Sequence, residues 1–193
     1  SPSGMLRSKS FYALWVCYAI ATLAGLTAIG MTASYGHRVI GLSVPAAAAT
    51  VSLLGIANGL GRPVFGIIHD RLGVRSTATL SFFVIAAGGA LSLFSSPGFP
   101  LAFFLGFAVL WFMLGGWLAI APAATTRLYG SRNYAKNYGI VYTAYGGGAR
   151  AGSGMSGLLV ARFGGYRPLF ALIAATALLG AIIAWVGLRG SER

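Results

Sequence analysis

The chain has 193 residues, of which 57% are hydrophobic and 8% are charged. Because a soluble domain carries about 25% charged residues, this composition excludes an ordinary water-soluble fold. The formal net charge of +12 would suit a nucleic-acid-binding protein, but the positions of the basic residues argue against that class, as described below.

Six apolar stretches occupy most of the chain. A helix needs about 20 mainly apolar residues to cross a bilayer, and short segments with the Gly, Pro, Ser and Asn residues of turns separate the stretches. We therefore predict transmembrane helices at residues 9–36, 44–69, 74–96, 99–127, 135–161 and 166–189. Short connections make neighbouring helices antiparallel. The expected fold is an all-α bundle of six transmembrane helices over residues 9–189.

Few residues lie outside these helices. Residues 1–8 lack an initiating methionine and resemble the end of an interdomain linker, which suggests that the chain is the later part of a longer polypeptide. Residues 190–193 are expected to form a cytoplasmic tail.

The basic residues gather on one side of the predicted bundle. Arg38, Arg162 and Arg167 lie at the other side. An excess of Lys and Arg marks the cytoplasmic face of a membrane protein, so we expect a multi-pass protein of the cell (inner or plasma) membrane with both termini inside. The charge reflects topology, and no nucleic-acid partner is expected. The residues on the basic side are Arg7, Lys9, Arg71, Arg75, Arg127, Arg132, Lys136, Arg189 and Arg193.

The predicted helix 44–69 contains an arginine well inside its apolar run. Arg62 lies eight residues before Asp70, which is roughly 12 Å along a helix. A guanidinium in hydrocarbon costs at least about 2.5 kcal/mol, so such a group usually faces a polar path. Its planar fork matches a carboxylate. We favour anion binding over a structural role or a snorkelling side chain.

The residues around Arg62 support this interpretation. Pro63 has no N–H and leaves the carbonyl of Gly59 without its helical hydrogen bond, which is tolerated where backbone lines a cavity. Asn58 lies one turn earlier on the same helical face. Its amide would orient the guanidinium or the bound anion, or else form a hydrogen bond to a neighbouring helix.

Aromatic side chains supply further candidates. Trp117 is the preferred pocket residue of helix 99–127 because of its depth, although a tryptophan in contact with lipid is equally ordinary. Tyr142 and Tyr145 lie deep in helix 135–161 and offer hydroxyl donors to a small polar anion; packing between helices is the alternative. With Tyr138, Ala149, Gly152 and Ser156 they form one helical face.

Other polar residues receive different interpretations. Arg150 lies about 100° around the helix from the tyrosine face, and we favour a structural or gating role over the binding of a second charge. The chain has only two acids, Asp70 and Glu192, both at predicted cytoplasmic ends. No embedded acid, metal-binding cluster or Ser/His/Asp arrangement is present, so we expect neither an enzyme nor a metal or cofactor.

Small residues at i, i+4 spacing allow close contact between membrane helices. Gly55 and Gly59 have this spacing, as do Gly148 and Gly152. Ordinary helix packing is the expected role of both pairs.

Three segments resemble a known family. Residues 66–75 read GIIHDRLGVR, which resembles the G-x-x-x-D-R-x-G-x-R loop of the major facilitator superfamily. Residues 58–66, NGLGRPVFG, and 137–146, NYGIVYTAYG, are similar to the branch that contains monocarboxylate transporters, bacterial lactate transporters among them, and oxalate/formate antiporters. The resemblance covers nearly the whole chain, which would be the carboxy-terminal half, helices seven to twelve of a twelve-helix fold.

The resemblance implies alternating access with Arg62 binding a carboxylate. It also implies that Asp70, Arg71 and Arg75 latch the chain to the missing amino-terminal six-helix half; the alternative is a role in topology alone. Animal monocarboxylate transporters have an acid at the position of Asn58. Dicarboxylate-carrying relatives can have a second cation where this chain has Tyr142 and Tyr145. A monocarboxylate such as lactate or pyruvate is therefore the expected substrate.

The predicted function is secondary active transport of small monocarboxylates, in symport with protons. Because no acid lies within the membrane in this half, the coupling acid would belong to the missing half, or the substrate would carry the proton. The close alternative is an antiporter of oxalate, formate or related anions. The alternative from another class is a non-transporting membrane sensor or assembly subunit that retains the fold.

Overall fold

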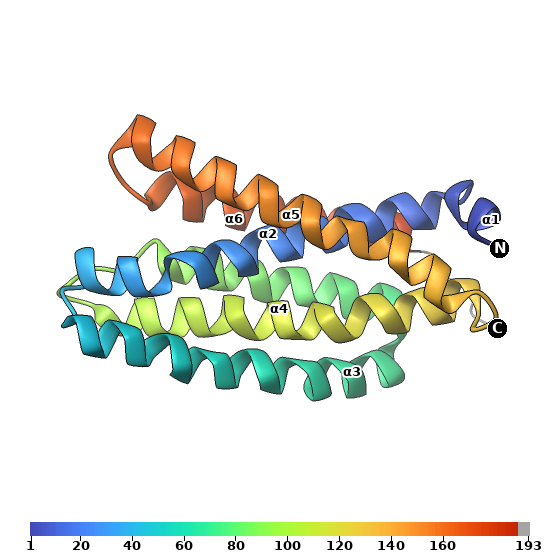
Figure 1. Cartoon of the computed structure of the whole chain (residues 1–193), viewed down its shortest axis with the longest axis horizontal. Helices are drawn as coiled ribbons and strands as arrows, with labels where there is room; N and C mark the ends of the chain where they lie inside the picture. The colour runs from blue at the N-terminus through green and yellow to red at the C-terminus, as the bar shows by residue number, and fades with distance from the viewer. Residues whose placement is uncertain (189–193) are drawn as a thin grey trace.

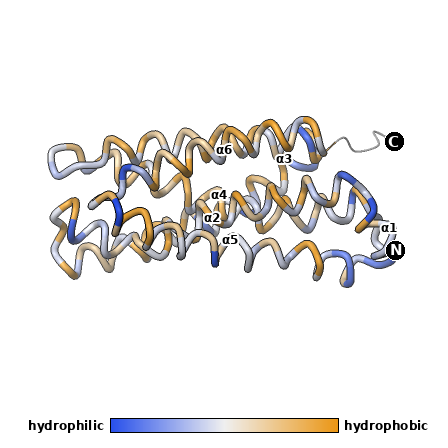
Figure 2. Tube along the Cα trace, turned by 90° about the horizontal axis from the view of Figure 1, so that it is seen from above, coloured by the Kyte–Doolittle hydropathy of each residue, from blue (hydrophilic) through white to orange (hydrophobic). Residues whose placement is uncertain are grey.

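The computed structural model describes residues 1–188, and the regular structure in this range is helical. The long helices lie side by side along one axis, and the amino terminus and the end of α6 are at the same end (Figure 1, Figure 2). The helices are α1 (Pro2–Leu6), α2 (Lys9–Arg38), α3 (Val44–Ser92), α4 (Pro100–Tyr129), α5 (Tyr134–Phe163) and α6 (Arg167–Gly187). The predicted linker residues 1–8 thus include the short helix α1, and the predicted tail 190–193 lies outside the described residues.

Helix α3 contains two of the predicted helices. Its hydrogen bonding runs over 49 residues, but Gly73 has φ 75° and ψ 177°, which is not a helical conformation. A positive φ costs glycine little because it has no Cβ. The chain reverses at this residue, so the segments 44–72 and 74–92 lie beside each other as two separate rods (Figure 1).

The starts of the helices follow from their sequences. The hydroxyls of Ser8 and Ser43 accept hydrogen bonds from the backbone N–H groups of Phe11 and Ala46, and so cap α2 and α3. Helices α3, α4 and α6 each have a proline in their first turn, where the missing N–H has no cost.

Four helices are long and apolar enough to cross a membrane: α2, α3, α4 and α6. Helix α5 is as long as α2, with 30 residues, but its glycines and the charge of Arg150 make it less apolar. The six-helix prediction is therefore supported in its coarser form, as an all-helical bundle with four candidate spans within residues 1–188.

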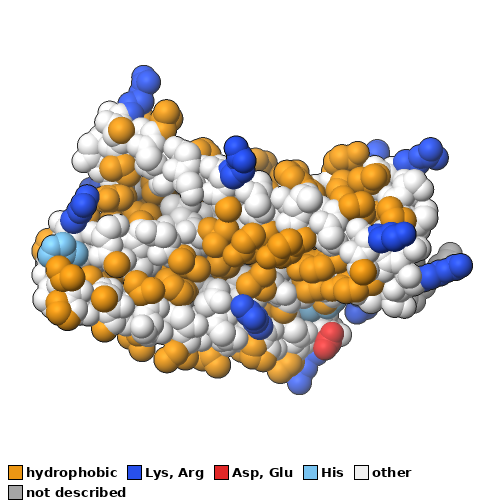
Figure 3. Space-filling view, viewed as in Figure 1, with side chains coloured by type: hydrophobic (Ala, Val, Ile, Leu, Met, Phe, Trp, Pro, Cys, Tyr) orange, Lys and Arg blue, Asp and Glu red, His pale blue; other side chains and the backbone are white. Residues whose placement is uncertain are grey.

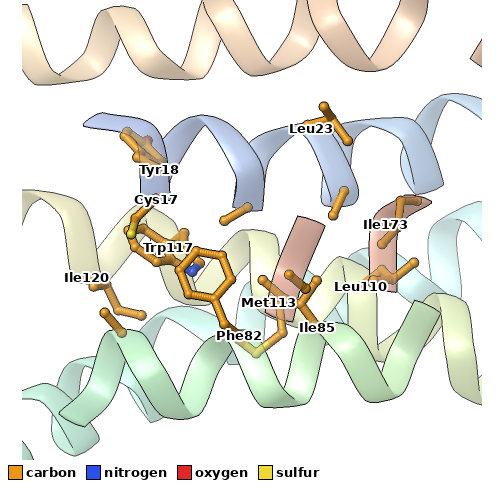
Figure 4. Close-up of a cluster of buried hydrophobic side chains, with 14 of the residues drawn as sticks. Cys17, Tyr18, Leu23, Phe82, Ile85, Leu110, Met113, Trp117, Ile120 and Ile173 are labelled. Atoms are coloured by element: carbon orange, nitrogen blue, oxygen red, sulfur yellow. The ribbon is translucent and has the colours of Figure 1, made fainter. Parts of the chain in front are cut away.

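The helices pack in an order that separates α5 from α6. Helix α4 contacts both α3 and α2, α5 packs mainly on α2, and α6 packs mainly on α3. Figure 2 shows α5 and α6 on opposite sides of the bundle. Figure 4 shows side chains of α2, α3, α4 and α6 meeting in one buried cluster; the cluster includes Cys17, Tyr18, Phe82, Ile85, Met113, Trp117, Ile120 and Ile173.

Glycines allow two of the helix pairs to come into backbone contact. A Cβ on Gly115 would overlap the carbonyl of Asn58, which joins α4 to α3. A Cβ on Gly148 would overlap the Thr22 hydroxyl, and one on Gly152 would lie 2.5 Å from the Thr27 Oγ1 atom, which joins α5 to α2.

The two i, i+4 glycine pairs behave differently. The packing prediction is confirmed for Gly148 and Gly152. It is wrong for Gly59, which has open space where a Cβ would be, and Gly55 has only the edge of the Trp111 ring at 4.0 Å. The backbone contact of α3 is made by Gly61 instead, since a Cβ there would overlap the Phe112 carbonyl of α4.

Candidate functional site

The Arg62 side chain is exposed, midway along the first segment of α3. The face seen in Figure 3 carries a band of apolar side chains, and most of its basic side chains lie towards the two ends of the molecule. Arg62 lies away from both ends of its helical segment, residues 44–72, as an exposed charge among apolar residues.

The backbone that carries Arg62 is fixed closely to α4. The preceding residue, Gly61, touches the α4 backbone at Phe112. One turn earlier, the Asn58 Nδ2 atom donates a hydrogen bond of 3.0 Å to the carbonyl of Trp111. Of the roles considered for Asn58, the structure realises the interhelical hydrogen bond.

Tyrosines form a continuous row along α5. The ring centroids of Tyr134 and Tyr138 are 5.6 Å apart, those of Tyr138 and Tyr142 are 5.7 Å apart, and those of Tyr142 and Tyr145 are 5.2 Å apart. Tyr142 is 42% exposed, and its ring stacks on Tyr145 with an interplanar angle of 10°. The structure thus brings Tyr142 and Tyr145 together on α5, whereas Arg62 belongs to α3.

A fifth tyrosine, Tyr18, supports this row from α2. Tyr18 is fully buried, and its ring centroid is 6.3 Å from that of Tyr142 and 6.2 Å from that of Tyr145. The sequence analysis missed Tyr18. The sequence offered one indication: Tyr18 is a tyrosine within an apolar helix, and a buried tyrosine hydroxyl usually needs a polar neighbour.

Trp117 lies in the core and is separated from the exposed residues. Its exposed fraction is 0%, and its Nε1 atom donates a hydrogen bond of 3.0 Å to the Ser81 hydroxyl. Tyr18 covers it, with stacked rings 5.9 Å apart (Figure 4). In this structure Trp117 packs beneath Tyr18, which in turn contacts the tyrosines of α5. A bound molecule would have to displace Tyr18 to touch Trp117.

Arg150 is exposed but points elsewhere. Gly148 and Gly152 both face α2, and the residue midway between them lies on the opposite side of the helix. Arg150 is therefore directed away from α2 and from the contact between α2 and α5.

The charged residues of the loop motif at residues 66–75 have two kinds of surroundings. Asp70 has an 85% exposed side chain and lies 3.9 Å from the ring of the buried His69, and Arg71 is exposed. Arg75 instead contacts its own chain, because its guanidinium carbon lies 3.6 Å from the centre of the Trp185 ring on α6. Within residues 1–188, no three His, Cys, Asp or Glu side chains form a group that could hold a metal ion.

Long apolar helices and their buried, glycine-rich contacts define a multi-pass membrane protein. The sequence profile of the Major Facilitator Superfamily matches residues 10–193. The chain belongs to this superfamily, which confirms the resemblance seen in its motifs.

Three curated relatives are similar to the chain. An uncharacterized transporter of the superfamily from Escherichia coli, YhjX, is 31% identical over 144 residues, which are 75% of this chain and 36% of the relative. The oxalate:formate antiporter of Oxalobacter formigenes is 27% identical over 180 residues, 93% of this chain and 43% of that protein. Human solute carrier family 67 member A1 is 32% identical over 161 residues, 82% of this chain and 38% of that protein. The chain therefore spans about two fifths of the length of each relative.

Proposed function

We propose that the chain is the carboxy-terminal six-helix half of a secondary active transporter for small monocarboxylates of the lactate and pyruvate type. Arg62 binds the carboxylate, and alternating access opens the site to each side of the membrane in turn. The observation that carries the proposal is the exposed guanidinium midway along an apolar helix. A cation at this depth requires a polar path and an anion.

The charge of the site supports a substrate with one carboxylate. Arg62 is the cation of the proposed site, whereas Arg150 is directed away from α2. The aromatic walls of Tyr142 and Tyr145 suit the small apolar part of lactate, and their hydroxyls suit its polar groups. In this proposal Asn58 holds the Arg62 turn in place through Trp111.

The alternative is an exchanger of oxalate, formate or related anions, and the similarity to the oxalate:formate antiporter favours it. Counterflow without a pH gradient, compared with net uptake under a pH gradient, separates the two. An exchanger loaded with unlabelled substrate accumulates labelled substrate by counterflow, and exchange is its only mode. A proton symporter in addition catalyses net uptake into empty liposomes when a pH gradient is imposed.

Proton coupling requires a partner outside this half. The two acids of the chain, Asp70 and Glu192, are both far from the middle of a predicted helix. We propose that the proton travels on the substrate or on an acid of the amino-terminal half. Lactate uptake that rises with an inward proton gradient would support this mode.

The missing half would pack on the face that carries Arg62. The six crossings of the proposal are α2, the segments 44–72 and 74–92, α4, α5 and α6, in the cell membrane with both termini cytoplasmic. Asp70 and Arg71 are exposed and available to latch the other half, whereas Arg75 already contacts Trp185. A membrane sensor or assembly subunit would retain this fold without moving substrate.

The test is lactate uptake by the full-length protein in liposomes, with and without a pH gradient. We expect Arg62→Lys to lower uptake at least about tenfold, because lysine keeps the charge but loses the fork, and a hydrogen bond to a charged group contributes about 1.5–3 kcal/mol. Undiminished uptake by this variant would remove Arg62 from the site. No uptake by the wild-type protein would favour the sensor.

The matched control is Arg150→Lys, the same change at the other exposed arginine within a helix. It should retain uptake close to that of the wild type. Loss of uptake in both variants would favour a substrate with two negative charges.

A further inference from the structure

A network of hydrogen bonds joins three helices next to Arg62. The Trp111 Nε1 atom of α4 donates to the Thr32 hydroxyl of α2 at 3.0 Å, and that hydroxyl donates to the Ala28 carbonyl at 2.6 Å. The Trp111 carbonyl accepts the 3.0 Å hydrogen bond from Asn58 of α3. Thr32 and Trp111 are both buried, so their hydrogen bonds are shielded from competing donors and acceptors.

This network of hydrogen bonds ends at the helical turn that carries Arg62. Asn58 lies one turn before Arg62, and Gly61 touches the carbonyl of Phe112, the residue after Trp111. The edge of the Trp111 ring also lies 4.0 Å from where a Cβ on Gly55 would be. Trp111 and its neighbour therefore contact α3 both before and directly beside the arginine.

This part of α3 needs outside support. Pro63 lies inside the helix, has no N–H and cannot bond the carbonyl of Gly59. The turn from Gly59 to Pro63 is thus held by fewer internal hydrogen bonds than an ordinary helical turn. Its geometry must be set by its contacts with α4, and those contacts depend on where Trp111 lies.

We propose that Thr32 and Trp111 are positioning residues for Arg62. The indole N–H bond to Thr32 fixes Trp111 relative to α2, and the Trp111 backbone fixes Asn58 and Gly61, so the guanidinium is held at one depth and one angle. This inference rests on the proposed role of Arg62 in binding a carboxylate. Bidentate binding by arginine requires a position accurate to about 0.5 Å, so small shifts of the turn weaken binding.

The variants Thr32→Val and Trp111→Phe test the proposal. Valine keeps the shape of threonine without the hydroxyl, and phenylalanine keeps a ring and the backbone carbonyl without the indole N–H. In the full-length protein in liposomes we expect each variant to raise the KM for lactate roughly tenfold, with a smaller change in maximal rate.

The structure offers a matched control in Thr125→Val. The Thr125 hydroxyl is also buried and also donates to the backbone carbonyl four residues earlier, at 2.7 Å. It lies on α4 about four turns beyond Trp111. Thr125→Val should lower the thermal stability of the purified protein, as Thr32→Val does, and leave the KM unchanged.

Three results would overturn the proposal: an unchanged KM in Trp111→Phe, an unchanged KM in a folded Thr32→Val, or an equal rise in KM with Thr125→Val. An Arg62→Lys variant is measured in parallel. If it leaves the KM unchanged, the proposed function fails; if it abolishes binding while Thr32→Val and Trp111→Phe bind normally, only the positioning role fails. Lactate-dependent stabilisation against heat reports binding independently of transport.

Discussion

The ring of Tyr145 is held by stacking on Tyr142 and by contact with Tyr18. These two aromatic neighbours restrict the rotation of the side chain. In the proposed site, Tyr145 is a preorganised donor for an anion bound to Arg62.

We predict that Tyr145→Phe raises the KM for lactate about tenfold or more, because one hydrogen bond to a charged group contributes about 1.5–3 kcal/mol. The stacking with Tyr142 remains, so the amount of folded protein should not change. Steady-state uptake in liposomes measures the effect. Tyr134→Phe, the same change at the first residue of α5, is the control; an equal rise there would contradict a specific role for Tyr145.

Some of the candidate site follows from sequence at this scale, and some does not. Arg62 stands out because a charge in an apolar run is costly, and Tyr142 and Tyr145 follow from helical spacing. The hydrogen bond from Asn58 to Trp111 could not be predicted, because it depends on how closely α3 approaches α4 at Gly61 and Gly115. Trp117 was chosen by depth alone, and depth does not distinguish a pocket from a core.

The contact between α2 and α5 depends on two glycines. Gly148 and Gly152 lie against the hydroxyls of Thr22 and Thr27 and also against the backbone carbonyls of Ala19 and Leu23, so the two backbones approach each other closely. Small residues at such contacts permit the close van der Waals packing that stabilises membrane helices.

We predict that Gly148→Ala and Gly152→Ala destabilise the protein by about 1–3 kcal/mol each, since overpacking forces the helices apart. Thermal unfolding in detergent and the yield of folded protein measure this. Gly154→Ala and Gly157→Ala are matched controls on the same helix, because a Cβ at either position meets open space. Equal losses at all four positions would show that general helix effects, rather than the contact, determine stability.

The helices themselves were largely predictable. Helices α2, α4, α5 and α6 begin and end within about two residues of the predicted bounds, because long apolar runs and turn residues determine where a membrane helix stops. Their pairing was less predictable. Gly55 and Gly59 have the same spacing as Gly148 and Gly152, yet only the second pair faces a neighbouring helix, and spacing does not report which way a helix is turned.

At the scale of the whole molecule, the charge pattern predicts orientation. The loop between α4 and α5 carries Arg132, and the loop between α3 and α4 has no charged residue. These two loops lie at opposite ends of the bundle (Figure 1).

We predict that a cysteine at Ser131 is cytoplasmic and one at Gly98 is external. In a cysteine-free full-length protein, a membrane-impermeant maleimide should label Gly98→Cys in intact cells and Ser131→Cys only after permeabilisation. Both residues are exposed, so access to the thiol does not limit labelling. Labelling of Ser131→Cys in intact cells would reverse the proposed topology.

The relation of this chain to its missing half could be anticipated only in outline. The family motif predicts a second half, and the exposed Asp70 and Arg71 suit a contact with that proposed half. The pairing of Arg75 with Trp185 was not predicted, because the two residues are distant in sequence and meet only when α6 packs on α3.

One hydrogen bond crosses the boundary between α2 and α5 near the predicted inner end. The Trp15 Nε1 atom donates to the Thr143 hydroxyl at 2.9 Å. Indole fluorescence is sensitive to hydrogen bonding and hydration at this N–H group. If alternating access separates α5 from α2, the surroundings of Trp15 change, and a variant that keeps Trp15 as the one tryptophan of this chain would report that separation without an attached dye.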